Sequence, residues 1–146
     1  MSGGVDRHWQ RRARPLLGTL VEIGVLVPEH GEPAAAIDAA FAVVCEAQAC
    51  LSRFDPNSDL ARFHALRGGE SCVVRPISQQ VLAAAHELRV AGGGMFDISL
   101  GSAPDGWTLL GFELTKSSDH VRLDLGGIGK GHAVDLAVEA LRESGC

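Results

Sequence analysis

The segment that most constrains the fold lies near the end of the chain and reads Leu123-Asp124-Leu125-Gly126-Gly127-Ile128-Gly129-Lys130-Gly131-His132. Apolar residues alternate with a carboxylate ahead of the glycines, which predicts a strand, and a helix is expected from about Lys130 to Glu143, closed by Gly145. A strand, a glycine turn and a helix are the first two-thirds of a βαβ unit, whose returning strand follows the helix. The sequence stops at Cys146 instead, so we expect a truncated domain.

The same glycine turn predicts an anion site. The N-terminus of a helix presents free N–H groups and a positive dipole end, glycines let a ligand approach the backbone, and Lys130 adds a positive charge. Two known phosphate loops are excluded, because Asp124 stands where Walker A needs a glycine and His132 stands where the Rossmann pattern needs one. A tight strand-to-helix turn without a ligand is the alternative interpretation.

The rest of the chain predicts a small α+β domain. A length of 146 residues fits one domain or a piece of one, and 46% apolar against 21% charged residues is typical of a globular protein. Ser58 and Ser78 are candidate N-caps, and Gly92 to Gly94 stop a helix. We expect helices over 33–53, 58–66 and 78–91, and strands over 16–27 (ending at Pro28), 71–75, 95–100, 107–112 and 120–125. The fold class is therefore α+β, with a mixed, mainly antiparallel sheet and three main helices.

Charge and hydropathy limit the partners. The net charge of −5 argues against nucleic acid, which needs a basic surface. Four arginines fall within residues 1–14, which we expect to be a basic, disordered tail ahead of a domain over 15–146.

The apolar run from Leu16 to Val27 carries Glu22, lacks a cleavage site and is shorter than the roughly 20 residues of a membrane helix. No transmembrane segment and a cytoplasmic location are therefore expected. The four cysteines show no C-x-x-C spacing and predict no zinc site.

Two carboxylates in predicted strands are further site candidates. Asp97 and Asp124 each lie between large apolar residues, so alternation places the acids on the opposite face. If the two strands are neighbours, the acids could hydrogen-bond a ligand or help bind Mg²⁺. Two solvated strand positions are the alternative. The sequence has no G-x-S-x-G and no H-E-x-x-H pattern, so nucleophile–histidine catalysis has no support.

Four stretches, in order along the chain, match the motifs of one protein family. They are Leu16-Leu17-Gly18-Thr19, similar to M-G-T; Leu51-Ser52-Arg53-Phe54-Asp55-Pro56-Asn57-Ser58-Asp59-Leu60, similar to L-S-x-[YF]-x-P-x-S-[ED]-[LI]; Gly94-Met95-Phe96-Asp97-Ile98-Ser99-Leu100-Gly101, similar to G-x-F-D-[IPV]-T-V-G; and the segment from Leu123 to Asp135, similar to D-L-G-G-I-A-K-G-Y-A-V-D. Together these stretches resemble the ApbE family of flavin transferases, the FAD:protein FMN transferases.

The resemblance implies an ApbE-like domain, related to the T-fold, of which residues 15–146 are the N-terminal portion. It also implies a Mg²⁺-dependent reaction. FAD is cleaved at its pyrophosphate, FMN is joined through phosphate to a threonine or serine hydroxyl of an acceptor flavoprotein, and AMP is released. Mg²⁺ would neutralise the pyrophosphate and stabilise charge in the transition state.

The resemblance also assigns site residues. Leu17 stands at a methionine position that contacts the flavin, Phe54 stands where an aromatic ring packs on the isoalloxazine, and Gly127 matches a position that helps to hold the metal. The FAD-binding set that it implies is Leu17, Phe54, Met95, Phe96, Asp97, Asp124 and Lys130. The family's catalytic histidine and most of its Mg²⁺ ligands lie in segments that follow the point where this chain stops. We therefore expect the 146-residue chain to bind FAD weakly and to transfer nothing.

Two other functions are weighed against this one. The first is a flavin-binding or partner-binding module in which the fold is kept and catalysis is not. The second is an α+β domain whose glycine turn binds some other phosphate compound. Relatives in the family often work in the periplasm or at the membrane, which contrasts with the cytoplasmic location expected here.

Overall fold

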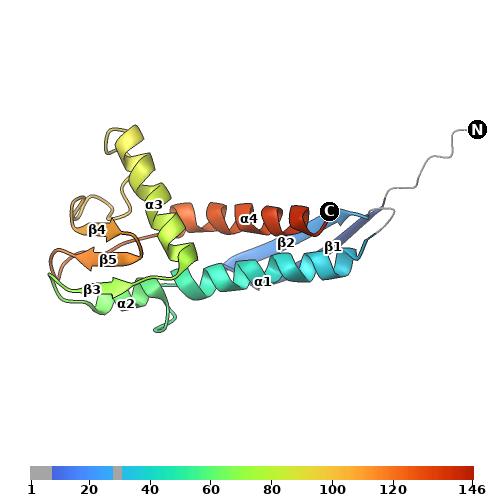
Figure 1. Ribbon diagram of the computed structural model, residues 1–146, viewed down its shortest axis with the longest axis horizontal. Helices are drawn as coiled ribbons and strands as arrows, with labels where there is room; N and C mark the ends of the chain where they lie inside the picture. Colours follow the sequence, from blue (N-terminus) through green and yellow to red (C-terminus); the bar gives the residue numbers. More distant parts are fainter. Residues whose placement is uncertain (1–7, 28–30) are drawn as a thin grey trace, which may run out of the picture. The chain divides into compact units, whose positions relative to one another are not determined.

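The computed structural model describes residues 8–27 and 31–146, and Figure 1 shows their helices and strands. In chain order the elements are β1 (Trp9–Leu16), β2 (Thr19–Leu26), α1 (Pro33–Leu51), α2 (Asp59–Ala65), β3 (Ser71–Val73), α3 (Pro76–Ala91), β4 (Trp107–Leu110), β5 (Glu113–Lys116) and α4 (Gly126–Glu143). The fold is mixed α+β with small antiparallel sheets, as predicted. Residues 1–7 of the expected tail, and Pro28, which was predicted to end a strand, lie outside the described residues.

The chain divides into two compact units, and the boundaries fall inside α1 and α4. The first unit holds the residues up to Glu46 together with Ala133–Cys146, and the second unit holds Ala47–His132. Each unit has a hydrophobic core of its own. The sequence predicts a tail over 1–14 and one domain over 15–146, whereas the structure divides the chain into two units within α1 and α4.

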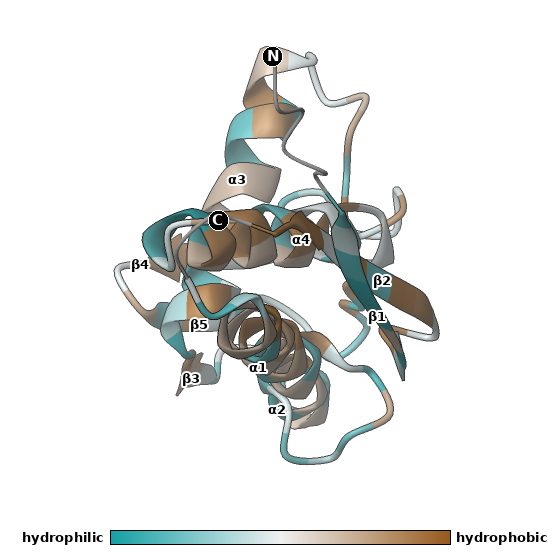
Figure 2. Cartoon of the chain, turned by 90° about the vertical axis from the view of Figure 1, so that its right-hand side faces the viewer, coloured by the Kyte–Doolittle hydropathy of each residue, from teal (hydrophilic) through white to brown (hydrophobic). Residues whose placement is uncertain are grey.

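In the first unit, β1 and β2 form an antiparallel hairpin with Trp9 opposite Leu26 and Leu16 opposite Thr19. Leu17 and Gly18 make the two-residue turn, and both have positive φ, as a type I′ hairpin turn requires. In Figure 2, β1 is coloured mainly as hydrophilic and β2 mainly as hydrophobic. The buried side of β2 supplies Ile23 to the core of this unit.

Residues 9–14 were expected to be disordered, and this expectation was wrong. They form most of β1, because pairing with β2 satisfies their backbone hydrogen bonds. Two of the arginines also have a partner in α1: Arg12 Nη1 and Arg14 Nη2 donate to Asp38 Oδ1, at 2.9 and 3.0 Å. The Arg14 guanidinium also lies over the ring of Phe41, with 4.4 Å from Cζ to the ring centroid.

In the second unit, the strands form a three-stranded antiparallel sheet in the order β3-β5-β4. Leu114 of β5 lies opposite Cys72 and Leu109 of the two outer strands and is buried. Buried side chains of α2, α3 and the sheet form one core with those of the segment before α4. Phe63 and Val81 are fully buried in this core.

Two predicted strands are absent from the described sheets. Residues 95–100 form an irregular segment that ends in a turn, and residues 121–125 are irregular and lie outside the sheet, while β5 takes residues 113–116. The predicted alternation over 121–125 is present, since Val121, Leu123 and Leu125 are buried and the residues between them are exposed. The amides of this segment donate to a side chain and to an irregular segment, so no ladder forms.

Some helix boundaries differ from the prediction: α4 begins at Gly126 and not at about Lys130, because the glycines form the first turn of the helix. Ser58 is the N-cap of α2, and its Oγ accepts from the N–H of Ala61, as predicted. Ser78 is not an N-cap, because α3 already begins at Pro76 and Ser78 Oγ donates instead to Asp59 Oδ2 at 2.6 Å. The positive φ of Gly145 and its N–H bond to Arg142 O fit the predicted C-terminal cap of α4.

One helix among the described residues, α1, is long and apolar enough to cross a membrane by length and composition alone. The core helix of a soluble protein passes the same test. Ile37, Phe41 and Val44 of α1 are almost completely buried in the core of the first unit. The absence of a transmembrane segment stays a prediction.

Candidate functional site

Three of the four family-like stretches meet where α4 begins, within the second unit. The N–H of Asp124 donates to the carbonyl of Ile98 at 2.7 Å, which joins the 94–101 stretch to the segment before α4. A Cβ atom built on Gly129 would lie 3.2 Å from Leu51 Cδ1, so the first turn of α4 also approaches the residue that opens the 51–60 stretch. The segments that carry Asp97 and Asp124 are therefore joined by a backbone hydrogen bond between irregular segments and not as paired strands.

The start of α4 carries both a carboxylate and a cation. Asp124 Oδ1 accepts from the N–H of Gly126 at 2.8 Å, so this carboxylate already caps the first amide of the helix. Lys130 is exposed one turn further on, and Gly127 is exposed between them. The amides of Ile128 and Gly129 donate to Leu125 O, so an anionic ligand at this turn would meet the Lys130 ammonium and the Gly127 amide beside a fixed negative charge.

Asp97 organises its own loop. Its Oδ1 accepts from the N–H of Ser99 at 2.9 Å, and its Oδ2 accepts from the N–H of Gly101 at 3.0 Å. Partial burial by itself would raise the pKa of the Asp97 carboxyl, but the hydrogen bonds from Ser99 and Gly101 and the charge of Arg89 outweigh it and lower this pKa. The carboxylate therefore fixes the turn over 97–101, where Leu100 has a φ of 55°.

The titration of Asp97 gives a test of this role. Because its pKa is lowered in the folded chain, the charged carboxylate stabilises the loop fully at neutral pH. That stabilisation is lost as the pH falls below the ordinary aspartate pKa and through the lowered value. Carboxyl ¹³C NMR should place the Asp97 midpoint below the ordinary value of an aspartate in a model peptide, and a midpoint at or above that value would contradict the assignment.

Apolar side chains of two stretches are unusually exposed. Phe54 is 81% exposed and Met95 is 93% exposed, and both belong to the predicted FAD-binding set. The Arg53 guanidinium lies over the Phe54 ring, with 4.8 Å from Cζ to the ring centroid. Phe96 differs, because it is partly buried and packs against the core of the second unit. Phe54 and Met95 are therefore the members of this set that present an open apolar surface to a ligand.

Leu17 belongs to the first unit, in the β1–β2 turn. Its φ of 56° is unusual for a residue with a branched side chain, and it packs against the core of that unit. Its predicted contact with flavin stays a prediction.

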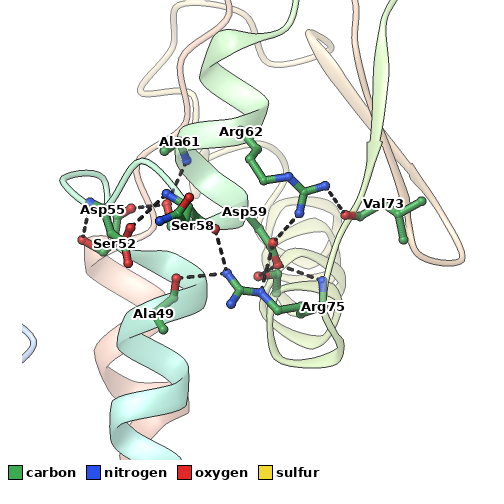
Figure 3. A network of polar contacts seen from close by, with 11 residues as sticks. Ala49, Ser52, Asp55, Ser58, Asp59, Ala61, Arg62, Val73 and Arg75 are labelled. Atoms are coloured by element: carbon green, nitrogen blue, oxygen red, sulfur yellow. Dashed lines mark hydrogen bonds and ion pairs between the residues drawn. The ribbon is translucent and has the colours of Figure 1, made fainter.

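Asp59 is a polar side chain of the second unit that accepts hydrogen bonds from three residues, and sequence reasoning did not single it out (Figure 3). It is 2% exposed. Asp59 Oδ1 accepts from Arg62 Nη1 and Arg75 Nε, and Oδ2 accepts from the Arg75 N–H and from Ser78 Oγ. Arg75 Nη2 also donates to Ala49 O at 3.0 Å. The network thus ties the 51–60 stretch to α3, and the signal in the sequence was the acid directly after the N-cap Ser58.

Lys116 and His64 form a second group that the sequence did not indicate. Lys116 is buried, and its Nζ donates to His64 O at 3.0 Å and to Leu66 O at 2.9 Å. Burial lowers the pKa of Lys116, as does the charge of Arg122, against the opposing effect of nearby acids. His64 Nε2 accepts from the N–H of Leu123 at 3.0 Å, so α2 is bonded directly to the segment before α4.

The described residues offer few ligands to a Mg²⁺ ion. Within 8–27 and 31–146, no group of three or more His, Cys, Asp or Glu side chains is arranged to hold a metal ion. Gly127, the predicted metal position, offers only its backbone, and a carbonyl in the first turn of a helix bonds to the amide four residues on. The described residues therefore do not by themselves supply a Mg²⁺ site, and the metal role of Gly127 stays a prediction.

No curated protein is significantly similar to this chain. Solved structures share its fold. The apo flavinyl transferase ApbE of Pseudomonas stutzeri has 22% identity and a TM-score of 0.85 over 95% of this chain and 51% of that one. The flavin transferase ApbE of Vibrio cholerae has 20% identity and a TM-score of 0.85 over 95% and 55%. The ApbE protein of Thermotoga maritima has 18% identity and a TM-score of 0.82 over 93% and 53%.

At these identities the structural similarity establishes the fold, and the chain spans about half the length of the solved structures that it matches. The match to the ApbE family itself covers residues 17–117 and 105–146. It includes all three stretches that meet at the start of α4 and most of the first stretch. By this match, the chain belongs to the ApbE family.

Proposed function

We propose that this chain contributes the FAD-binding half of a flavin transferase, with the start of α4 as the centre of its site. The observation that carries the proposal is the meeting of three family-like stretches there, through the Asp124–Ile98 bond and the contact between Gly129 and Leu51. Membership of the family supports flavin transfer in general. The donor, the acceptor group and the metal are the finer parts of the proposal.

The proposed reaction joins FMN to an acceptor flavoprotein. A threonine or serine hydroxyl of the acceptor attacks the FMN phosphorus of FAD, the pyrophosphate bond breaks, and AMP leaves with the bridging oxygen. The hydroxyl proton is lost to a base that this chain is not proposed to supply. Phe54 offers an exposed aromatic face to the isoalloxazine, and Lys130 offers a positive charge to the pyrophosphate.

The experiment that tests FAD binding is a flavin fluorescence titration of the purified chain, with and without Mg²⁺. Binding that saturates and tightens with Mg²⁺ supports both the site and the proposed metal dependence. Binding that is indifferent to Mg²⁺ removes the metal from this half of the site. An affinity for AMP or inorganic pyrophosphate that exceeds the affinity for FAD would instead favour a site for another phosphate compound.

Replacing Phe54 with alanine should weaken FAD binding by roughly ten- to hundredfold. Burial of a phenylalanine against a ligand is worth about 1.5–3 kcal/mol, and about 1.4 kcal/mol corresponds to tenfold. Phe112 is a matched control, because it is also an exposed phenylalanine of the second unit, at 51%, but lies outside the four stretches. Phe112→Ala should leave the affinity unchanged, and an equal loss in the two variants would contradict the role of Phe54.

A non-catalytic module that binds flavin or a partner protein is the second candidate. It is favoured by the exposed side chains of Phe54 and Met95, which could contact a flavin or a partner protein without any chemical step. An assay for covalent FMN on an acceptor flavoprotein separates the two candidates. Measurable transfer by the 146-residue chain would exclude the module. The cytoplasmic location is likewise proposed, and cell fractionation tests it.

A further inference from the structure

His64 lies in the last turn of α2 and bonds to a segment 59 positions further along the chain. Its Nε2 accepts from the N–H of Leu123 at 3.0 Å. The next amide, that of Asp124, donates to Ile98 O at 2.7 Å, and Asp124 Oδ1 then accepts from Gly126 at 2.8 Å. Since residues 121–125 belong to no described sheet, these bonds replace a strand ladder in fixing the segment.

The position of His64 is itself held by two cations. Lys116 Nζ donates to the His64 carbonyl at 3.0 Å, and Arg122 Nη1 approaches the same carbonyl at 3.4 Å. The imidazole also packs edge-on against Phe63, with 6.0 Å between ring centroids. The backbone and the ring of His64 are therefore both fixed, and the acceptor nitrogen is presented to Leu123 in one orientation.

We propose that His64 is a positioning residue for the candidate site: its Nε2 holds the segment 121–125 so that Asp124 and the first turn of α4 are presented to the ligand. This inference rests on the proposed function for the identity of that ligand. The His64 Nε2 bonds to Leu123, which is not one of the predicted FAD-binding residues, so His64 acts through Leu123. The claim about the segment can be tested without FAD.

The bond requires a neutral imidazole, because Nε2 accepts only when it carries no proton. Burial lowers the pKa of His64, and the charges of Arg122 and Lys116 lower it further, while the bond from Leu123 acts in the opposite direction. The acids Glu70 and Asp119 act on Lys116, where they oppose the lowering of its pKa. The cations around His64 therefore favour the form that accepts from Leu123 at neutral pH.

The test compares His64→Leu, which removes the acceptor, with His64→Gln, whose Oε1 can stand near the position of Nε2. His86→Gln is the matched control, because His86 is an exposed histidine of the same unit and packs instead on Trp107. Amide hydrogen exchange is measured by NMR at Leu123 and Asp124, and FAD affinity is measured by fluorescence on the same samples between pH 5 and 8. Exchange is expressed relative to the amides of α1.

We expect His64→Leu to accelerate exchange at Leu123 and Asp124 by about tenfold, which is the effect of losing one hydrogen bond of about 1.4 kcal/mol. FAD should bind more weakly to this variant by a similar factor, and His64→Gln should restore both properties. The wild-type affinity should fall on acidification as His64 is protonated, whereas His64→Gln should lack that part of the pH profile. His86→Gln should match the wild type.

Unchanged exchange at Leu123 in His64→Leu would overturn the proposal, whatever FAD does. Failure of His64→Gln to restore exchange would overturn it as well. If the wild-type chain binds no FAD while exchange responds as expected, the proposed function fails and the positioning of the segment stands. If exchange responds but FAD affinity is equal in all variants, the segment is positioned without serving the ligand, and the proposal is overturned.

Discussion

Replacing Asp59 with alanine is expected to lower the free energy of unfolding by about 3–5 kcal/mol. The Asp59 carboxylate is buried and accepts four hydrogen bonds from Arg62, Arg75 and Ser78 (Figure 3). Removal of the carboxylate leaves the Arg75 amide and the Ser78 hydroxyl without this acceptor in the core, and it leaves two guanidinium groups without their counter-charge. Urea unfolding followed by circular dichroism measures the change.

A matched control for Asp59 is Asp105, which also pairs with an arginine but has a side chain that is 96% exposed. Asp105→Ala should cost less than about 1 kcal/mol, as exposed ion pairs usually do. Asp59→Asn keeps the shape and part of the acceptor capacity and should fall between the two alanine variants. A cost for Asp59→Ala as small as that for Asp105→Ala would show that the network does not stabilise the fold.

Replacing Phe41 with alanine is expected to destabilise the first unit by about 3–5 kcal/mol. Phe41 is completely buried between β2 and α1 residues of the core, and the Arg14 guanidinium lies over its ring. The variant loses the transfer free energy of the ring and leaves a cavity that the surrounding core fills only in part. It also removes the cation–π contact that helps to order β1.

The two tryptophans allow the loss to be located, because Trp9 lies in the first unit and Trp107 in the second. In a Trp107→Phe background, fluorescence of Trp9 reports on the hairpin, and Phe41→Ala should shift its urea midpoint strongly. Phe112→Ala is the control in the same background and should change the midpoint little, since Phe112 is half exposed and lies in the other unit. An unchanged Trp9 transition in Phe41→Ala would contradict the packing described here.

Local signals in the sequence predicted most helix ends, although α4 begins at Gly126 and not at about Lys130. Pro33 at the start of α1, Ser58 at the cap of α2, the glycines after Ala91 and Gly145 after α4 act on atoms within a few residues of themselves. The motifs of the four stretches also predicted the family, because motif identity depends only on the order of residues. Those parts of the protein could be recognised without knowledge of any long-range contact.

Contacts between residues far apart in the sequence decided the structure of the segments that local signals did not predict. Residues 9–14 look like a solvated basic tail, but pairing with β2 and ion pairs to Asp38 make them a strand. The segment 121–125 has the alternation of a strand, but its amides bond to His64 and Ile98 and no sheet takes it in. Periodicity reports which side of a segment is buried and does not report which partner its backbone finds.

The candidate site shows the same division. Sequence determined which residues are available at the glycine turn, namely a carboxylate, glycines and a lysine in the order that a helix start favours. Only the tertiary structure decided that Asp124 caps that helix, that Phe54 stays exposed while Phe96 joins the core, and that Asp59 and His64 hold the surrounding segments. The physical reason is that burial and hydrogen-bond partners are properties of the packed chain, and residues far apart in sequence create them together.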